Sequence, residues 1–174
     1  MIVVADAGPL LALTKIEALG LLRDLYQSVV TGPTVYTEAV TAGLAMEAGD
    51  AEVLNATYQR GELIVRIPTL AALPHSGLLH AGEEESIRLA VELQAGLLLV
   101  DDLDARQVAQ RNFDTLGASA GIKGTLGVIV SAANARLISP AQAIEMVKVL
   151  KYRPDVWLAS SVCDAVVEVL RRFS

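Results

Sequence analysis

Several residue types are scarce in this sequence, and each shortage excludes a class of protein. One cysteine, Cys163, stands among 174 residues, so an internal disulfide framework is impossible. The longest uncharged run, residues 67–82, contains two prolines and is shorter than the ~20 residues that a membrane-spanning helix needs. No basic segment precedes the first apolar run, so we find no secretory signal. These absences predict a cytoplasmic protein without a membrane partner.

Histidine is also scarce. The two histidines, His75 and His80, lie in a loop that contains proline and glycine. No further ligand residues stand at a useful spacing from them, and we interpret both as surface residues.

The composition that remains indicates one domain over residues 1–174 with a large core, because 53% of the residues are apolar. The apolar surplus also fits a buried surface in a homodimer or a higher homo-oligomer. A net charge of −6 argues against a generic nucleic-acid coat. Residues 1–105 carry a net −10 and residues 106–174 a net +4. This split fits a metal cavity beside a rim that holds phosphate, and it fits plain solvated surface charge equally well.

Short apolar runs alternate with helical periodicity along the chain. The runs at 2–5, 29–30, 63–67 and 97–100 predict strands, and a brief further strand is expected near Ile122. Helices are predicted at about 9–16, 19–25, from 33 onward, and at 45–60, 82–95, 103–113, 125–135, 140–152 and 157–173. The uninterrupted apolar run 97–100 suits a strand buried on both faces of a parallel sheet. The alternation therefore predicts an α/β fold.

The last predicted helix has an apolar stripe. We expect Trp157 and the stripe of Val162, Val166 and Val169 to pack this helix onto the body of the domain. The stripe alternatively forms a dimer face.

Acidic residues recur after the predicted strands. Asp6 directly follows the first strand, and Glu38 lies in the first turns of the helix after the second strand. Taken alone, Asp6 fits a helix N-cap, and Glu38 fits an acid favoured by the helix dipole. However, the carboxyl ends of parallel strands meet at one edge of the sheet, where open α/β sheets bind ligands. Both acids are therefore candidates for one site.

Two further groups of acids flank the fourth strand. Glu83, Glu84 and Glu85 open the helix before it, and Asp101 and Asp102 follow it. Glu84 is spaced to pair with the arginine four residues later on a solvated face. Either Glu83 or Glu85 can turn inward, and helix geometry does not choose between them. One of the two aspartates caps the next helix, whatever its other role.

So many like charges could be buried together only with a cation to neutralise them. Oxygen ligands without nearby His or Cys favour Mg²⁺ or Mn²⁺, ions that support phosphodiester hydrolysis. The candidate metal ligands are Asp6, Glu38, Glu83, Glu85, Asp101 and Asp102. The candidates for holding substrate phosphates, from charge and position alone, are Arg106, Arg111 and Lys123.

Five short motifs resemble, in order, those of PIN-domain proteins, and more narrowly a prokaryotic branch related to VapC toxin ribonucleases. They are DAGPLLALTKI (6–16), GPTVYTEAV (32–40), GEEESIRLA (82–90), LLLVDDLDAR (97–106) and GIKGTLGVI (121–129). The resemblance covers a core of about residues 2–150 and leaves 153–174 as a C-terminal helix on that core or in a dimer face.

This resemblance implies a three-layer α/β/α fold around a parallel sheet of four or five strands. It also implies a metal-dependent ribonuclease that acts on RNA and pairs with an antitoxin. The catalytic quartet that it implies is Asp6, Glu38, Glu85 and Asp101, with Glu83 and Asp102 as neighbours able to share those roles.

Departures from the family pattern leave an alternative open. Ala7 and Gly8 stand where many relatives carry a hydroxyl that supports the metal, and the third acid is Glu where the toxins usually have Asp. A PIN-like module that binds an antitoxin or dimerises without turnover fits these departures. A receiver-type phosphoacceptor domain fits less well, because it places its acid pair after the first strand.

Overall fold

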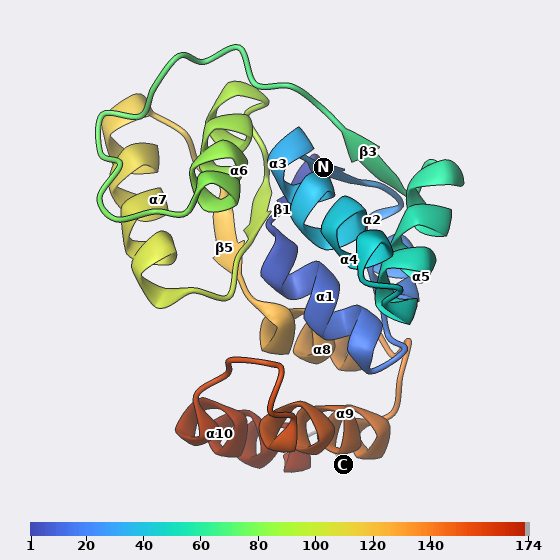
Figure 1. Cartoon of the computed structure of the whole chain (residues 1–174). Coiled ribbons are helices and arrows are strands. Elements are labelled where there is room, and N and C mark those ends of the chain that lie inside the picture. Colours follow the sequence, from blue (N-terminus) through green and yellow to red (C-terminus); the bar gives the residue numbers. More distant parts are fainter. Residues whose placement is uncertain (173–174) are drawn as a thin grey trace.

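Five parallel strands form the centre of the molecule in the computed structural model, which describes residues 1–172 (Figure 1). They are β1 Val3–Ala5, β2 Val29–Thr31, β3 Leu63–Val65, β4 Leu97–Leu99 and β5 Gly121–Lys123. The strand order is β3-β2-β1-β4-β5, and Val4 is paired with Val30 on one side and Leu98 on the other. The predicted α/β fold with a parallel sheet is confirmed, with five strands.

Helices connect these strands and continue beyond them. They are α1 Ala7–Lys15, α2 Gly20–Tyr26, α3 Pro33–Tyr36, α4 Ala42–Ala45, α5 Gly49–Gln59, α6 Ala81–Glu92, α7 Leu103–Leu116, α8 Thr125–Asn134, α9 Pro140–Tyr152 and α10 Ser160–Arg171. A π-helical turn, η1 Thr37–Thr41, links α3 to α4. The helix predicted at 45–60 is shorter than expected: it begins at Gly49, after a turn that closes α4.

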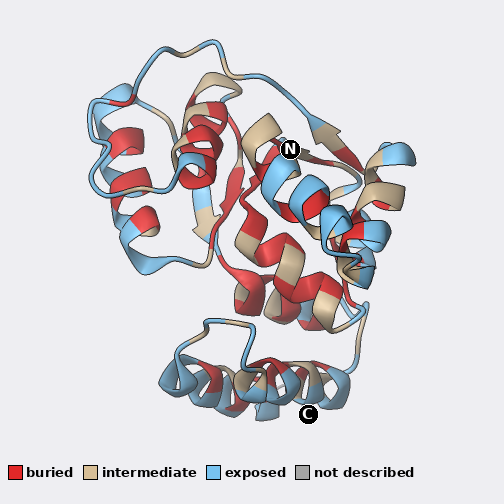
Figure 2. Cartoon of the chain, in the orientation of Figure 1, coloured by how far each residue is buried: buried red, intermediate tan, exposed pale blue. Residues whose placement is uncertain are grey.

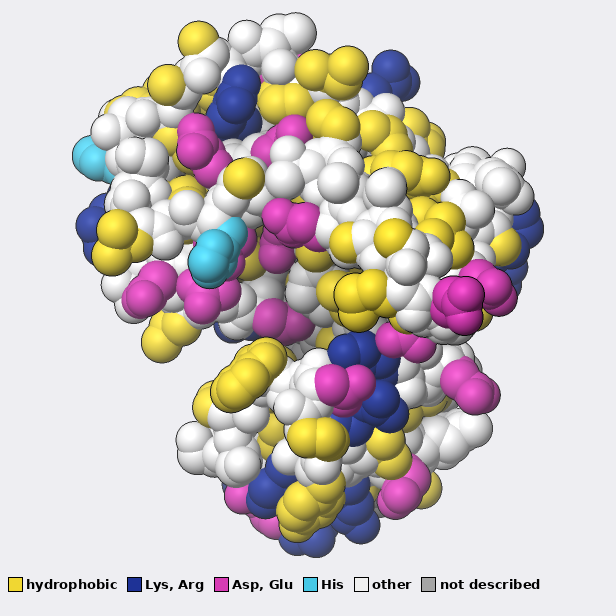
Figure 3. Space-filling model, viewed as in Figure 1, with side chains coloured by type: hydrophobic (Ala, Val, Ile, Leu, Met, Phe, Trp, Pro, Cys, Tyr) yellow, Lys and Arg dark blue, Asp and Glu magenta, His cyan; other side chains and the backbone are white. Residues whose placement is uncertain are grey.

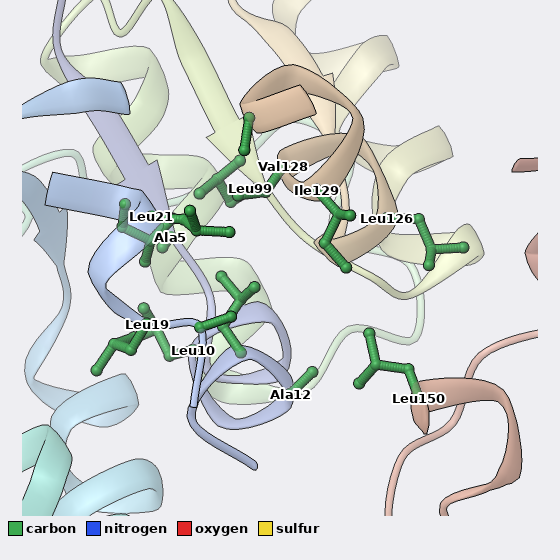
Figure 4. Close-up of a cluster of buried hydrophobic side chains, with 14 of the residues drawn as sticks. Ala5, Leu10, Ala12, Leu19, Leu21, Leu99, Leu126, Val128, Ile129 and Leu150 are labelled. Atoms are coloured by element: carbon green, nitrogen blue, oxygen red, sulfur yellow. The ribbon is translucent and has the colours of Figure 1, made fainter. Parts of the chain in front are cut away.

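The sheet is covered on both faces, because successive strand residues point to opposite sides. Val3, Ala5 and Leu99 join the core with α1, α2 and α8, whereas Val4 and Leu98 join the core with α6 and α7. Figure 2 shows the central strands as buried. In Figure 4 the first of these cores extends from the sheet through α1 and α8 to Leu150 of α9. The α9–α10 pair thus adds a further layer.

The packing of α10 differs from the prediction. Cys163 and Leu170 are fully buried. Of the predicted stripe, Val166 is partly buried against the same core, whereas Val162 and Val169 are 51% and 43% exposed. The helix begins at Ser160, so Trp157 precedes it and is 93% exposed instead of packed on the body. Periodicity could not separate two apolar stripes with the same spacing on one helix. Phe173, the predicted helix end, lies outside the described residues.

Within residues 1–172, no helix combines the length and the apolar character needed to cross a lipid bilayer.

The inward stripe of α10 can be tested with two neighbouring residues. Leu170→Ala should lower the free energy of unfolding by about 2–5 kcal/mol, because a fully buried leucine leaves a cavity. Val169→Ala, on the outward side, should change it by less than about 0.5 kcal/mol. Urea unfolding followed by circular dichroism measures both. Equal losses would contradict the observed orientation of the helix.

Candidate active site

Asp6 stands where the central strand ends and α1 begins. Its backbone N–H donates to Leu99 O at 2.9 Å, which extends the β1–β4 pairing by one residue. Its carboxylate accepts from Gly8 N at 3.4 Å and thereby caps α1. Only 8% of Asp6 is exposed, because strands on both sides and α6 enclose it. Asp6 is therefore both the helix cap and a buried acid at the carboxyl edge of the sheet.

Two glycines leave room for other carboxylates beside Asp6. A Cβ atom on Gly82 would lie 2.8 Å from Glu38 Oε2 and 3.3 Å from Asp6 Oδ1. A Cβ atom on Gly8 would lie 3.7 Å from Asp101 Oδ2 and 3.8 Å from Asp6 Oδ2. Glu38 thus approaches Asp6 beside Gly82, and Asp101 approaches it beside Gly8. The three acids follow three different strands and lie at one edge of the sheet.

Glu38 reaches this place from the π-helical turn η1. A π turn inserts an extra residue into a helix and is frequent at functional sites. Burial raises the pKa of the Glu38 carboxyl, the nearby charge of His80 lowers it, and Glu85 and Glu83 raise it further. His80, which we interpreted as an incidental surface residue, is therefore a close neighbour of the acidic cluster.

The structure separates Glu83 from Glu85, which helix geometry alone could not. Both are 8% exposed. Glu83 lines the same pocket as Asp6, and its Oε2 accepts from His80 N at 2.9 Å. Glu85 points to α3 instead, where its Oε2 accepts from Thr34 N at 2.7 Å. Glu85 supplies the cap that the glycine preceding α3 lacks, because glycine has no side chain.

Asp101 and Asp102 also have different surroundings. Asp101 accepts from Thr125 N at 2.7 Å and from Thr125 Oγ1 at 2.5 Å, with Arg106 Nη2 at 3.9 Å. Burial raises the pKa of the Asp101 carboxyl, although Thr125 and Arg106 oppose that shift. Asp102 is exposed and caps α7 by accepting from Ala105 N at 2.8 Å. Thr125, which belongs to the motif GIKGTLGVI (121–129), therefore holds Asp101 in place.

Four of these acids line a pocket of about 250 Å³, and Glu38 and Glu85 are not part of its lining. Asp6, Glu83, Asp101 and Asp102 form one side, and the loop between α9 and α10 forms the other. Figure 3 shows this region as a hollow between the main body and the α9–α10 pair, with acidic side chains gathered along its upper border. A larger hollow of about 620 Å³ beside the start of α9 lacks acidic lining residues, so the smaller pocket is the better candidate for chemistry.

The donors in this pocket fit a hard divalent ion in kind. Burial raises the pKa of Asp6 to about 6, against the N–H groups of Ala7 and Gly8, and the charges of Glu83 and Glu38 add to the shift. A cation would relieve this repulsion. Across residues 1–172, however, no three His, Cys, Asp or Glu side chains are grouped closely enough to hold a metal ion. Side-chain rotation is therefore required before three acids share one ion.

None of the three predicted phosphate-binding residues lines the pocket, although Arg106 lies 3.9 Å from Asp101, which does. Arg106 Nε donates to Val100 O at 2.9 Å, and Lys123 Nζ donates to Ser131 Oγ at 2.9 Å. Arg111 is exposed on α7. Their role in binding phosphate remains a prediction. Lys15 does line the pocket. Local sequence patterns did not indicate this position, because only folding brings the last turn of α1 beside the α9–α10 loop.

The fold and the pocket define a class: an α/β protein with a cluster of buried carboxylates at the carboxyl edge of a parallel sheet. The chain belongs to the PIN-domain family, because a family model described as PIN domain matches residues 2–172. Members of this family are generally nucleases and usually use divalent metal ions. Among solved structures, the chain is similar to a PilT N-terminus domain protein from the hyperthermophilic archaeon Sulfolobus solfataricus P2. The TM-score is 0.54 and the identity 22%, over 76% of this chain and 93% of the other. No curated protein matches the sequence.

The raised pKa of Asp6 predicts a specific pH dependence of stability without metal. Because the pKa rises from 3.8 to about 6 on folding, the folded state favours the protonated acid. Stability should therefore fall as the pH rises from about 4 to above 6, by about 1–3 kcal/mol. Asp6→Asn should remove this fall and be the more stable protein at pH 7. Urea unfolding in EDTA measures the difference.

The matched control is Asp104→Asn, which neutralises an exposed aspartate in the first turn of α7. It should leave the pH profile of the wild type unchanged between pH 4 and 7. If the stability of the wild type and of Asp6→Asn changed with pH in the same way, burial would not raise the pKa of the Asp6 carboxyl.

Proposed function

We propose that this protein is a metal-dependent endoribonuclease that hydrolyses RNA phosphodiester bonds with Mg²⁺ or Mn²⁺. One observation carries the proposal: Asp6 is buried at the end of the central strand, and Glu38 and Asp101 each share with it the space beside a glycine. Charges of one sign at such a place are costly in the absence of a cation. A structural role alone would require only the capping bond to Gly8.

The proposed metal ligands are Asp6, Glu38, Glu83 and Asp101. When bound, the ion activates water and stabilises the leaving oxygen of the phosphodiester. Thr125 holds Asp101 through two hydrogen bonds and so fixes where its carboxylate lies. Glu85, given a catalytic role by the family resemblance, is instead proposed to anchor α3, which leads directly into the turn that carries Glu38. Asp102 remains at the mouth of the pocket as the cap of α7.

We further propose that the enzyme is the toxin-like component of a toxin–antitoxin pair, with an antitoxin as partner. The five motifs shared with the VapC-related branch support this, in the order in which that branch has them. Homo-oligomerisation is proposed from the apolar composition. A protein-binding module without turnover is the alternative. It gains some support from Ala7 and Gly8, because they supply no hydroxyl next to Asp6.

The first test is Mn²⁺ titration by calorimetry, together with cleavage of a mixed-sequence RNA, for the wild type and Asp6→Asn. We expect the wild type to bind Mn²⁺ and cleave RNA, and the variant to lose binding and at least about 100-fold in rate, because metal charge stabilisation amounts to several kcal/mol. Asparagine still caps α1, so the variant should fold. Full activity in Asp6→Asn would refute the assignment. An absence of Mn²⁺ binding by both proteins would favour the protein-binding module.

A second test separates two glutamates that are equally exposed on one helix. Glu83→Gln should weaken Mn²⁺ binding by at least about tenfold, since even outer partners of metal ligands typically contribute that much. Glu85→Gln should bind Mn²⁺ about as well as the wild type, because its amide oxygen still accepts from Thr34 N. The reverse pattern would restore Glu85 to the set of ligands. Thermal unfolding of both variants checks that the fold is kept.

A further inference from the structure

The loop between α9 and α10, residues 153–159, forms the wall of the pocket opposite the acids. Asp155, Val156 and Trp157 of this loop line the pocket together with Asp6 and Asp101. Trp157 is the single tryptophan of the chain, and 93% of it is exposed. An indole gains free energy from burial and usually finds a partner. Here its ring is left free at the mouth of an acidic pocket.

This exposed ring is carried on a fixed loop. Lys15 Nζ donates to Asp155 O at 2.8 Å and forms an ion pair with the Asp155 carboxylate at 3.0 Å. Arg153 donates to both carboxylate oxygens of Asp155 at 2.9 Å and to Lys15 O at 3.4 Å. These bonds hold the pKa of Asp155 well below its usual value. The loop is therefore tied to the last turn of α1, whose first turn begins beside Asp6.

Positive charge also lies on this side of the pocket, on Lys15 of α1 and on Arg153, and both side chains are paired with Asp155 of the loop. Lys15 lines the pocket, and Arg153 lies within hydrogen-bonding distance of its carbonyl. Figure 3 shows Lys and Arg side chains in the hollow between the main body and the α9–α10 pair. One wall therefore offers carboxylates for a cation, and the other offers basic side chains and an aromatic face. A chain that carries both negative phosphates and aromatic bases matches the basic side chains and the indole ring better than a protein segment does.

We propose that Trp157 is a substrate-binding residue that stacks on a base of single-stranded nucleic acid next to the cleaved phosphate. The inference rests on the proposed nuclease function and adds to it the residue that holds the base. Aromatic side chains bind successive bases of single strands by stacking, with little sequence preference, because every base has a π-face. Lys15 and Arg153 are positioning residues for this ring, since they hold the loop that carries it.

Steady-state cleavage of a short single-stranded RNA tests the proposal with three variants. Trp157→Ala should raise KM by about tenfold, within the range measured for loss of one base–aromatic stack, and leave kcat close to the wild type. Trp157→Phe should restore most of the affinity, because a smaller aromatic ring still stacks. Tyr152→Ala is the matched control: it removes another exposed aromatic ring, 78% exposed at the end of α9 and outside this pocket.

A substrate with abasic nucleotides beside the cleaved bond separates stacking from a distorted loop. On this RNA, the wild type and Trp157→Ala should have the same KM, because no base remains to stack. The single tryptophan supplies a second readout: the indole fluorescence of the inactive Asp6→Asn protein should be quenched as the normal RNA is titrated in, and much less by the abasic RNA.

Three outcomes would overturn the proposal. An unchanged KM in Trp157→Ala, with an active wild type, refutes the stacking role and leaves the nuclease assignment intact. An equal loss on normal and abasic RNA shows that the residue shapes the loop and does not bind a base. If the wild type neither cleaves nor binds RNA, and Trp157→Ala instead abolishes binding of a protein partner, the stacking role and the nuclease function fall together.

Discussion

The burial of like-charged carboxylates at one edge of the sheet is the constraint on which the rest of this structure depends. Strands covered by helices on both faces place Asp6 and Asp101 at neighbouring strand ends, where Asp6 is buried and Asp101 is partly buried. Charge in such a place is destabilising unless a cation or hydrogen-bond donors compensate for it. The surrounding structure supplies hydrogen-bond donors for several of these acids. For Asp6 they are the N–H groups of Ala7 and Gly8, which only partly offset the effect of burial on its pKa, while the charges of Glu83 and Glu38 add to that effect.

The elements around the cluster serve to hold each acid in a fixed position. Thr125, at the start of α8, binds Asp101 twice, and the backbone at the start of α6 binds Glu83. Glu85 ties α6 to α3 and so connects two of the segments that carry acids. Such preorganisation keeps the charges close at a cost in stability, which is common where function requires a strained site.

The α9–α10 pair changes what this edge of the sheet can bind. The parallel sheet and its covering helices would present the acids on an open edge, whereas the α9–α10 loop adds a second wall that carries Trp157 and the ion pair between Asp155 and Lys15. The pair packs through Leu150, Cys163 and Leu170 onto the core that includes α8 and α1. Ordinary hydrophobic packing far from the acids thus fixes the width of the pocket.

Local sequence patterns were enough to predict the class of fold and to propose most of the acids in the cluster. Apolar runs of strand length, of which the first and the fourth are directly followed by a carboxylate, predict a parallel sheet with acids at one edge, because strand direction alone decides where those side chains emerge. Local patterns could not decide between Glu83 and Glu85, which lie two residues apart on one helix. The choice depends on a bond to Thr34, a residue 51 positions away from Glu85. Nor could they predict the exposure of Trp157, because α10 begins only at Ser160 and leaves Trp157 in the loop before it. Contacts such as Glu85 with Thr34 and Asp155 with Lys15 join residues far apart in the sequence, so local patterns do not reveal them.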